Sequence, residues 1–468
     1  MKIIVAYRNH ERLAAIRHAF DHAARVMGLP SFDPRPLPEC MDLDGSDCDI
    51  LITYSSPIPD CRHPRRIHIC ESPFFGDAWF TGRSLPRTPL PRFEDLPVLF
   101  DGRPGDAPWV QVRPGLVQSR ADIPAGIFFL ISRYEETLVS ERDRFQRFPS
   151  DASILVQSGI LERPLADEYA LLLASWITEL CPDFRLPSLW GGRPFVLHVT
   201  HDVDVLRKHT WKKALGLRVP PLRALRTLLG ASPDPWWTFP EIQAVHKRLG
   251  IRPDYFLPAG GTHALDRSMN LRSRDASALL GLLKDSECGL GIHFSLSAHL
   301  SLMRDENTAA FARELESFRA VAGHDPAGSR QHYLGFSIPG TWRVLDRLGI
   351  PFDATLGFPE RPGFRCGTCH PFRAFDLKVC VPLGLVEIPL IAMDATYLHY
   401  LGTSPAEALA GMKSLLSAVR KCRGVMSVLW HNNTLSREDH PGWSEAFADF
   451  LDHAVEQGPL AGNPLGSS

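Results

Sequence analysis

The feature that most constrains the fold is a repeated alternation of strands and helices in the second half of the chain. Short apolar runs at residues 195–202, 254–257, 289–293 and 425–430 are separated by stretches whose apolar residues recur at helical spacing. Parallel strands need crossover connections of this kind, and about 250 residues of such units is the size of one barrel. We therefore expect an α/β fold with a barrel-like domain whose chemistry lies where its strands end.

The first part of the chain predicts a second, smaller α/β domain. Three apolar runs within the first 70 residues are typical of strands, and residues 11–27 repeat apolar side chains at helical spacing. Residues 181–194 are rich in proline and glycine, as expected of a linker. We expect an N-terminal α/β domain with a mostly parallel sheet over residues 1–190, followed by the barrel domain over residues 191–468.

Composition narrows the class of protein. The formal net charge of -2 gives no support for a nucleic-acid partner. No apolar run approaches the roughly 18 residues needed for a membrane span, and the first residues resemble a strand more than an export signal. The ten cysteines are scattered irregularly, which favours reduced thiols. These patterns predict a cytoplasmic protein.

The strand at residues 195–202 leads into two carboxylates, Asp202 and Asp204. Side chains of a strand alternate between its faces, so both carboxylates leave on the same side. Two like charges at that separation are stabilised by a cation between them. A divalent metal satisfies this requirement, and an Asp-x-Asp turn that caps backbone amides is the structural alternative.

Three further strand ends carry ionisable groups. They are His293, the group Arg330, Gln331 and His332, and His431. A single histidine at a strand end is usually a hydrogen-bonded structural residue. Four strand ends that all deliver ionisable groups are harder to obtain from packing alone, and they predict a functional site.

Other patterns have both a functional and a structural interpretation. Residues 207–227 carry seven Lys or Arg and no acidic residue, which fits a lid over a phosphate or a solvated helical excursion. Cys366 and Cys369 have the spacing of a zinc knuckle, but no second pair follows, so a turn with ordinary thiols is favoured. Asp394 follows an apolar run and could orient His431 or cap a strand end.

The successive motifs resemble those of the polysaccharide deacetylases, which share the NodB homology domain and include carbohydrate esterase family 4. The matching motifs are Thr200-His-Asp-Val-Asp204, Ile292-His-Phe-Ser295, Ser329-Arg-Gln-His-Tyr333 and Leu429-Trp-His431. The resemblance covers residues 196–435. It implies a distorted (β/α) barrel with one divalent metal, usually zinc, at an Asp-His-His site, and removal of acetyl groups from sugars.

The residue sequences of three segments more closely resemble those of a bacterial branch of this family, whose members have an added N-terminal domain. These segments are Gly328-Ser-Arg-Gln-His-Tyr-Leu334, Arg365-Cys-Gly-Thr-Cys-His-Pro-Phe372 and Trp430-His-Asn432. Residues 132–136 and 142–148 resemble that added domain.

The resemblance implies a role for each matching residue. Asp202 corresponds to the general base, and Arg330 to the partner that keeps it ionised and oriented. His431 corresponds to the general acid. Tyr333 corresponds to the residue whose backbone amide helps to bind the oxyanion.

The implied metal ligands are Asp204 and His293, and the third ligand departs from the family pattern. The family's second histidine follows the first by four residues, where this chain has Ser297. We expect His332 to replace it, because it stands beside Arg330 at a strand end, in place of the proline of the third motif. His299 is the alternative, as is a site with only two ligands.

These observations predict a metal-dependent hydrolase that removes an acetyl group from an amino sugar. Absence of an export signal favours a cytoplasmic precursor, such as a nucleotide- or lipid-linked sugar, over mature cell-wall polymer. A degenerate glycan-binding or assembly protein is one alternative, because the fourth-position histidine is missing. An amidase that acts on another C–N bond is the second.

Overall fold

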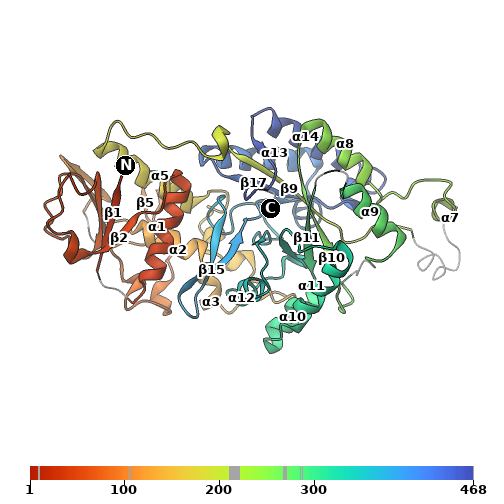
Figure 1. Cartoon of the computed structure of the whole chain (residues 1–468), viewed down its shortest axis with the longest axis horizontal. Helices are drawn as coiled ribbons and strands as arrows, with labels where there is room; N and C mark the ends of the chain where they lie inside the picture. Colours follow the sequence, from red (N-terminus) through yellow and green to blue (C-terminus); the bar gives the residue numbers. More distant parts are fainter. Residues whose placement is uncertain are drawn as a thin grey trace.

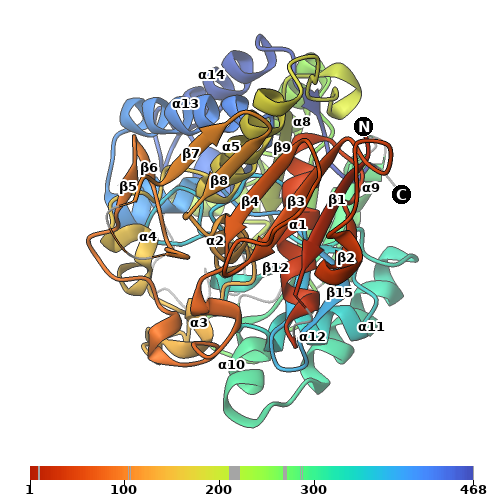
Figure 2. The same ribbon diagram turned by 90° about the vertical axis from the view of Figure 1, so that its left-hand side faces the viewer.

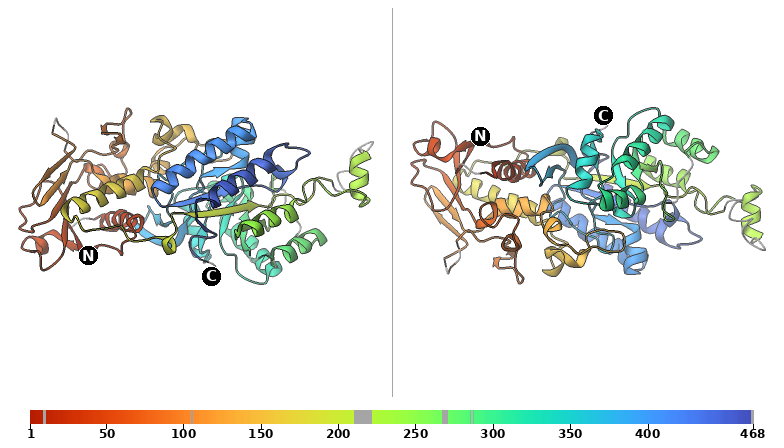
Figure 3. Two further views of the ribbon diagram at one scale, coloured as in Figure 1. Left: turned by 90° about the horizontal axis from the view of Figure 1, so that it is seen from above. Right: turned by 90° about the horizontal axis from the view of Figure 1, so that it is seen from below.

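A computed structural model describes residues 1–8, 11–103, 105, 107–209, 222–266, 271–284, 286 and 288–466 of the chain. Two sheets form the body of the molecule. The smaller, N-terminal sheet lies at one end of the long axis, and the larger sheet occupies the rest (Figures 1 and 3). No helix in the described part of the chain combines the length and the apolar character that crossing a membrane requires.

The N-terminal sheet has the strand order β2-β1-β3-β4-β8-β7, and all its pairs are parallel except β7 with β8 (Figure 2). Its strands are β1 (Ile3–Tyr7), β2 (Asp33–Pro36), β3 (Ile50–Ser55), β4 (Arg66–Cys70), β7 (Val110–Arg113) and β8 (Leu116–Ser119). Three helices that pack on one another are α1 (Leu13–Met27), α2 (Ile123–Ile131) and α5 (Leu165–Leu180). The division of the chain at residue 190 stays a prediction.

Short elements fill two connections of this part of the chain. The hairpin strands β5 (Arg92–Phe93) and β6 (Leu96–Pro97) lie between β4 and β7, and the helices α3 (Glu135–Leu138) and α4 (Ile154–Gln157) lie between α2 and α5.

The larger sheet has the order β14-β15-β13-β12-β11-β10-β9-β17-β16, and β18 also pairs with β9. Its strands are β9 (Val196–Asp202), β10 (Asp254–Pro258), β11 (Gly289–Phe294), β12 (Ser329–Gln331), β13 (Phe352–Asp353), β14 (Phe372–Asp376), β15 (Val381–Glu387), β16 (Ala392–Met393), β17 (Val425–Leu429) and β18 (Leu460–Ala461). The pairs are parallel except β14 with β15. Within the described residues β14 and β16 do not pair, so the expected barrel is an open sheet curled into a half-barrel.

Helices cover this sheet, as the alternating pattern predicts. They are α8 (Phe239–Leu249), α9 (Arg274–Lys284), α10 (Leu296–Asp305), α11 (Ala309–Ala322), α12 (Gly340–Arg347), α13 (Pro405–Lys421) and α14 (Trp443–Val455). Their ends follow local chemistry. Ser404 and Glu407 form a capping box at the start of α13, and Gly250 ends α8 in the left-handed conformation.

The basic insert at residues 207–227 is described only in part, since residues 210–221 lie outside the described residues. Its last portion, α7 (Leu222–Leu228), projects away from the half-barrel (Figures 1 and 3). At its start, Arg207 pairs with Asp275 and Lys208 pairs with Asp439. Two of the seven basic side chains of the insert therefore form ion pairs within the protein. The interpretation of the insert as a lid stays a prediction.

A buried charge network joins the N-terminal part to the half-barrel. Glu136, at the start of α3, accepts hydrogen bonds from Arg133 at 2.8 Å and from Arg365 at 2.8 and 3.0 Å. All three side chains are at most 2% exposed. The two segments that the sequence singled out, residues 132–136 and 365–372, therefore contact each other across the expected boundary.

Candidate functional site

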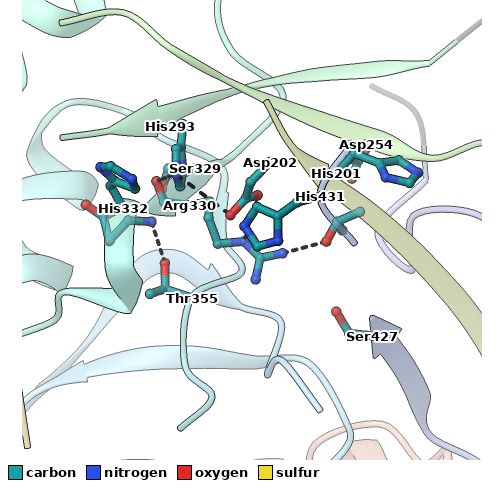
Figure 4. A network of polar contacts seen from close by, with 12 residues as sticks. His201, Asp202, Asp254, His293, Ser329, Arg330, His332, Thr355, Ser427 and His431 are labelled. Carbon is teal, nitrogen blue, oxygen red and sulfur yellow. Dashed lines mark hydrogen bonds and ion pairs between the residues drawn. The ribbon is translucent and has the colours of Figure 1, made fainter. Parts of the chain in front are cut away.

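The carboxyl ends of the parallel strands bring the predicted residues to one edge of the sheet. Asp202 is the last residue of β9, and Asp204 follows two residues later. His293 lies near the end of β11, His332 directly follows β12, and His431 lies two residues beyond β17. Figure 4 shows Asp202, His293 and His431 converging from different strands.

Asp204, His293 and His332 form a group whose potential ligand atoms all lie within 4.8 Å of one another. The Nε2 atoms of His293 and His332 lie 3.4 and 3.6 Å from Oδ1 of Asp204. Two imidazoles and one carboxylate are a donor set that zinc and similar divalent metals accept.

The ring orientations of both histidines suit a metal ligand. Nδ1 of His293 faces the carbonyl oxygen of Arg330 at 3.2 Å, and Nδ1 of His332 faces Oδ1 of Asp266 at 3.3 Å. Because Nδ1 faces an acceptor in each ring, it carries a hydrogen, which leaves Nε2 as the atom that can bind a metal beside Asp204. Such outer hydrogen bonds fix the tautomer of metal-binding histidines.

The carboxylates of Asp204 and the neighbouring Asp202 have unused hydrogen-bonding capacity. Burial favours a raised pKa for Asp204, but the neighbouring His332, His293 and His431 outweigh it and hold the pKa well below its usual range. Oδ1 of Asp204 and Oδ1 of Asp202 are buried and have no hydrogen-bond partner among the described residues. Buried carboxylate oxygens without partners, beside the Nε2 atoms of two imidazoles, fit a divalent cation.

Arg330 approaches the second carboxylate from β12. Its Nε lies 3.7 Å from Oδ1 of Asp202, and its Nη2 donates to Oγ1 of Thr200 at 2.7 Å. The guanidinium is fully buried, so its charge and that of Asp202 are shielded from water together. The guanidinium of Arg330 can therefore orient Asp202, while the backbone carbonyl of the same residue faces His293.

His431 forms a carboxylate–imidazole pair with Asp394, which directly follows β16. Nδ1 of His431 lies 2.7 Å from Oδ1 of Asp394, whose other oxygen accepts the backbone N–H of His431 at 2.8 Å. Burial opposes the charged imidazole, but the carboxylates of Asp394, Asp204 and Asp202 raise the pKa of His431 to about 10. The ring is therefore protonated at neutral pH, with Nε2 3.9 Å from Oδ2 of Asp204.

A cavity of about 420 Å³ opens beside these residues. Its lining includes Arg144 and Arg147, which come from the N-terminal part of the chain. Arg147 donates to the carbonyl oxygen of Tyr333 at 2.6 Å, and the ring of Phe145 stacks on that of Tyr333 at 5.0 Å. Residues 142–148 therefore contribute two arginines to the lining of the cavity, a position that the sequence did not predict.

The structure does not bring His299 to this site. His299 lies on α10, is 1% exposed, and its Nε2 lies 3.1 Å from the carbonyl oxygen of Phe145. Ser297, at the position of the family's second histidine, has its hydroxyl 2.9 Å from that of Ser295. Of the imidazoles considered from the sequence, His332 is the one that joins Asp204 and His293.

Asp266 is a residue of the site that sequence reasoning missed. Besides His332, it accepts hydrogen bonds from the backbone N–H groups of Leu296 and Ser297. Although burial opposes ionisation, these contacts lower the pKa of Asp266 to about 2. The rule that site residues follow strand ends could have found it. Asp266 lies in the loop that follows β10, a strand of the same parallel sheet.

Comparisons with known proteins give a partial match. Residues 49–182 match the model of a family of unknown function, DUF7033. No curated protein matches the chain.

Among solved structures, a Mycobacterium smegmatis protein described as a polysaccharide deacetylase is 20% identical, with TM-score 0.42 over 59% of this chain and 90% of that one. A polysaccharide deacetylase from Bacillus cereus is 12% identical, with TM-score 0.30 over 57% and 91% of the two chains. A family 4 carbohydrate esterase pseudoenzyme from Bacillus anthracis is 12% identical, with TM-score 0.30 over 58% and 64%. Because these TM-scores lie below 0.5, we base the functional argument on the geometry of the site.

Proposed function

We propose that this protein is a metal-dependent hydrolase that removes an acetyl group from a phosphate-bearing amino sugar. The observation that carries the proposal is the placement of Asp202 and the His431–Asp394 pair around the group formed by Asp204, His293 and His332. A base, an acid and a metal-binding group at one cavity are the parts that amide hydrolysis needs.

The metal would be held by Asp204, His293 and His332. When bound there, it supplies polarisation of the acetyl carbonyl and of an attacking water. Asp202, oriented by Arg330, accepts the proton of that water. The backbone N–H of Tyr333 is assigned to the developing oxyanion, where a preorganised donor contributes most.

His431 is assigned as the general acid. Its raised pKa keeps the imidazolium protonated at neutral pH, and Asp394 fixes the ring through Nδ1. The Nε2 hydrogen is then available for the departing amine. Proton transfer of this kind contributes about 100- to 10,000-fold in rate.

Arg144 favours a substrate that carries a phosphate. Its side chain is exposed at the cavity and forms no ion pair with a described residue, and its guanidinium lies 4.6 Å from the ring of Phe145. An unpaired guanidinium at a cavity mouth suits a phosphate. A nucleotide- or lipid-linked N-acetylamino sugar has both the phosphate and the acetamido group.

The test is acetate release from a nucleotide-linked N-acetylamino sugar by the zinc-loaded protein. We expect Asp202→Asn and His431→Ala each to lower kcat by at least about 100-fold. His453→Ala, on α14, is the matched control and should retain activity. Full activity in both site variants would contradict the assignments, and sugar binding without acetate release by the wild type would favour a glycan-binding protein.

A further inference from the structure

A second group of metal-ligating side chains lies outside the proposed active site. Asp167 of α5 and the adjacent residues Cys369 and His370, which precede β14, offer ligand atoms within 4.8 Å of one another. All three residues are at most 1% exposed. None of them lines the cavity that contains Asp204, His293 and His332.

The contacts of this group centre on the carboxylate of Asp167. Sγ of Cys369 lies 3.1 Å from Oδ2 of Asp167, and the backbone N–H of Cys369 donates to the same oxygen at 2.8 Å. Oδ1 of Asp167 accepts a hydrogen bond from the hydroxyl of Thr368. A thiol and a carboxylate oxygen therefore already face each other at short range.

His22 of α1 lies beside the other oxygen of the same carboxylate. Its Nε2 lies 3.4 Å from Oδ1 of Asp167, and its side chain is 2% exposed. Neither ring nitrogen of His22 forms a hydrogen bond with a described residue. Buried imidazole nitrogens without partners are uncommon and indicate a missing ligand, which a cation beside Asp167 would provide.

The ring of His370 is held by an outer contact. Its Nε2 lies 2.8 Å from the carbonyl oxygen of Cys422, so Nε2 carries the hydrogen and Nδ1 keeps a lone pair. A backbone carbonyl that fixes one nitrogen while the other binds is the usual environment of a metal-ligating histidine.

We propose that His22, Asp167, Cys369 and His370 bind a structural zinc ion. The donor set of two imidazoles, one thiolate and one carboxylate fills four positions and leaves none for substrate, as in structural zinc sites. Thiolate and carboxylate together neutralise a divalent cation, so the buried site carries no net charge. Binding breaks the S–H bond of Cys369 and releases its proton to solvent.

The thiolate of Cys369 forms only where a cation offsets the effect of burial. Without a cation, burial and the neighbouring Cys422 and Asp167 raise the pKa of Cys369 well above its ordinary value. Zinc reverses this effect, because a coordinated thiol is deprotonated. The ligands come from α1, α5 and the segment before β14, so the ion would fasten the N-terminal helices to the half-barrel.

The first test uses the wild-type protein loaded with Co²⁺ in place of zinc. We expect a near-ultraviolet thiolate-to-cobalt absorption, because Cys369 supplies a sulfur ligand. The site formed by Asp204, His293 and His332 has only oxygen and nitrogen donors and cannot produce this absorption. A cobalt-loaded protein without a thiolate absorption would overturn the proposal, whether or not the enzyme is active.

The second test compares metal content after purification in zinc without chelator. We expect about two zinc ions per chain in the wild type and about one in Cys369→Ser, since one thiolate ligand is lost. Cys366→Ser is the matched control, because Cys366 is equally buried but lies outside the group. Asp204→Asn should also lose one ion but keep the thiolate absorption of the cobalt form. Equal zinc content in wild type and Cys369→Ser would contradict the assignment.

Discussion

His332 and His299 are the two imidazoles that could replace the absent histidine at position 297, and their surroundings separate them. Nε2 of His332 faces Asp204, whereas Nε2 of His299 faces a backbone carbonyl oxygen. We expect His332→Ala to weaken zinc binding at the proposed active site by at least about 10-fold, because one of three ligands is lost. His299→Ala should leave affinity unchanged. Competition with a chromophoric chelator measures both, and the reverse order would exclude His332 as a ligand.

Asp266 acts on the metal through His332. Because it holds Nδ1 of that ring, Asp266→Asn should lower zinc affinity about 10- to 100-fold, the range typical of outer-shell residues. Asp275→Asn is a suitable control, since Asp275 also pairs with a basic side chain but lies outside the group. Unchanged zinc affinity in Asp266→Asn would show that the turn after β12 orients His332 without the contact from Asp266.

At the residue scale, the strand-end rule predicted the main side chains of the site. Asp202, Asp204 and His293 follow from a periodicity of two and from the parallel sheet, which the sequence displays directly. Asp266 and Arg144 do not follow from any spacing. They reach the site through loops whose paths depend on packing, and a loop path has no periodic signal in the sequence.

At the element scale, residues 142–148 contribute Arg144 and Arg147 to the cavity lining, and Phe145 packs behind them on Tyr333. Arg144 is the one that remains exposed, so it can contact substrate without disturbing this packing. We expect Arg144→Ala to raise KM for a nucleotide-linked sugar about 10-fold, equivalent to about 1.4 kcal/mol, with little change in kcat. Steady-state kinetics with the phosphate-free sugar is the control, and Arg144→Lys should recover part of the affinity. An equal rise in KM for both sugars would contradict phosphate recognition.

Long apolar strands were easier to predict than short ones. β9, β11 and β17 are five to seven residues long and mostly buried, and each appears in the sequence as a largely apolar run. β12 has three residues and β13 has two, which is too short for a periodic pattern. Their positions are set by pairing with neighbouring strands. Because these partners are distant in sequence, the pairing produces no local sequence pattern.

At the scale of the whole molecule, the sequence indicated repeated strand–helix units but not how the sheet ends. Closure of a barrel depends on whether the first and last strands pair, which no local pattern specifies. Here β14 turns back against β15 in an antiparallel hairpin at one end of the sheet, and β16 ends the other. Helices α1 and α5 contribute to the group around Asp167 beside β14, which links the N-terminal part to this end of the sheet.

The buried network of Glu136 with Arg133 and Arg365 predicts how strongly the two parts depend on each other. Glu136→Gln leaves the buried guanidinium of Arg365 without its counter-charge, whereas Arg133 keeps its buried ion pair with Glu135, so we expect a loss of about 3 to 5 kcal/mol in the free energy of unfolding. Arg361→Ala breaks the exposed pair with Asp151, which crosses the same boundary, and should cost less than about 1 kcal/mol. Urea unfolding followed by tryptophan fluorescence measures both, and equal losses would show that burial of the network is unimportant.

Several buried imidazoles make the stability of the whole molecule depend on pH. Burial lowers the pKa of several histidines, to about 3 for His18, to about 4 for His68, His201 and His299, and well below the ordinary value for His246. These groups stay neutral in the folded protein, whereas the unfolded chain binds protons below about pH 6.5. The free energy of unfolding should therefore fall as pH decreases below 6.5, by about 1.4 kcal/mol per pH unit for each such group until its folded pKa is reached. His431, whose pKa is raised, is protonated in both states in this window and does not change the slope. Urea unfolding midpoints at about pH 7, 6 and 5 test this, and equal midpoints would mean that the buried rings gain protons without unfolding.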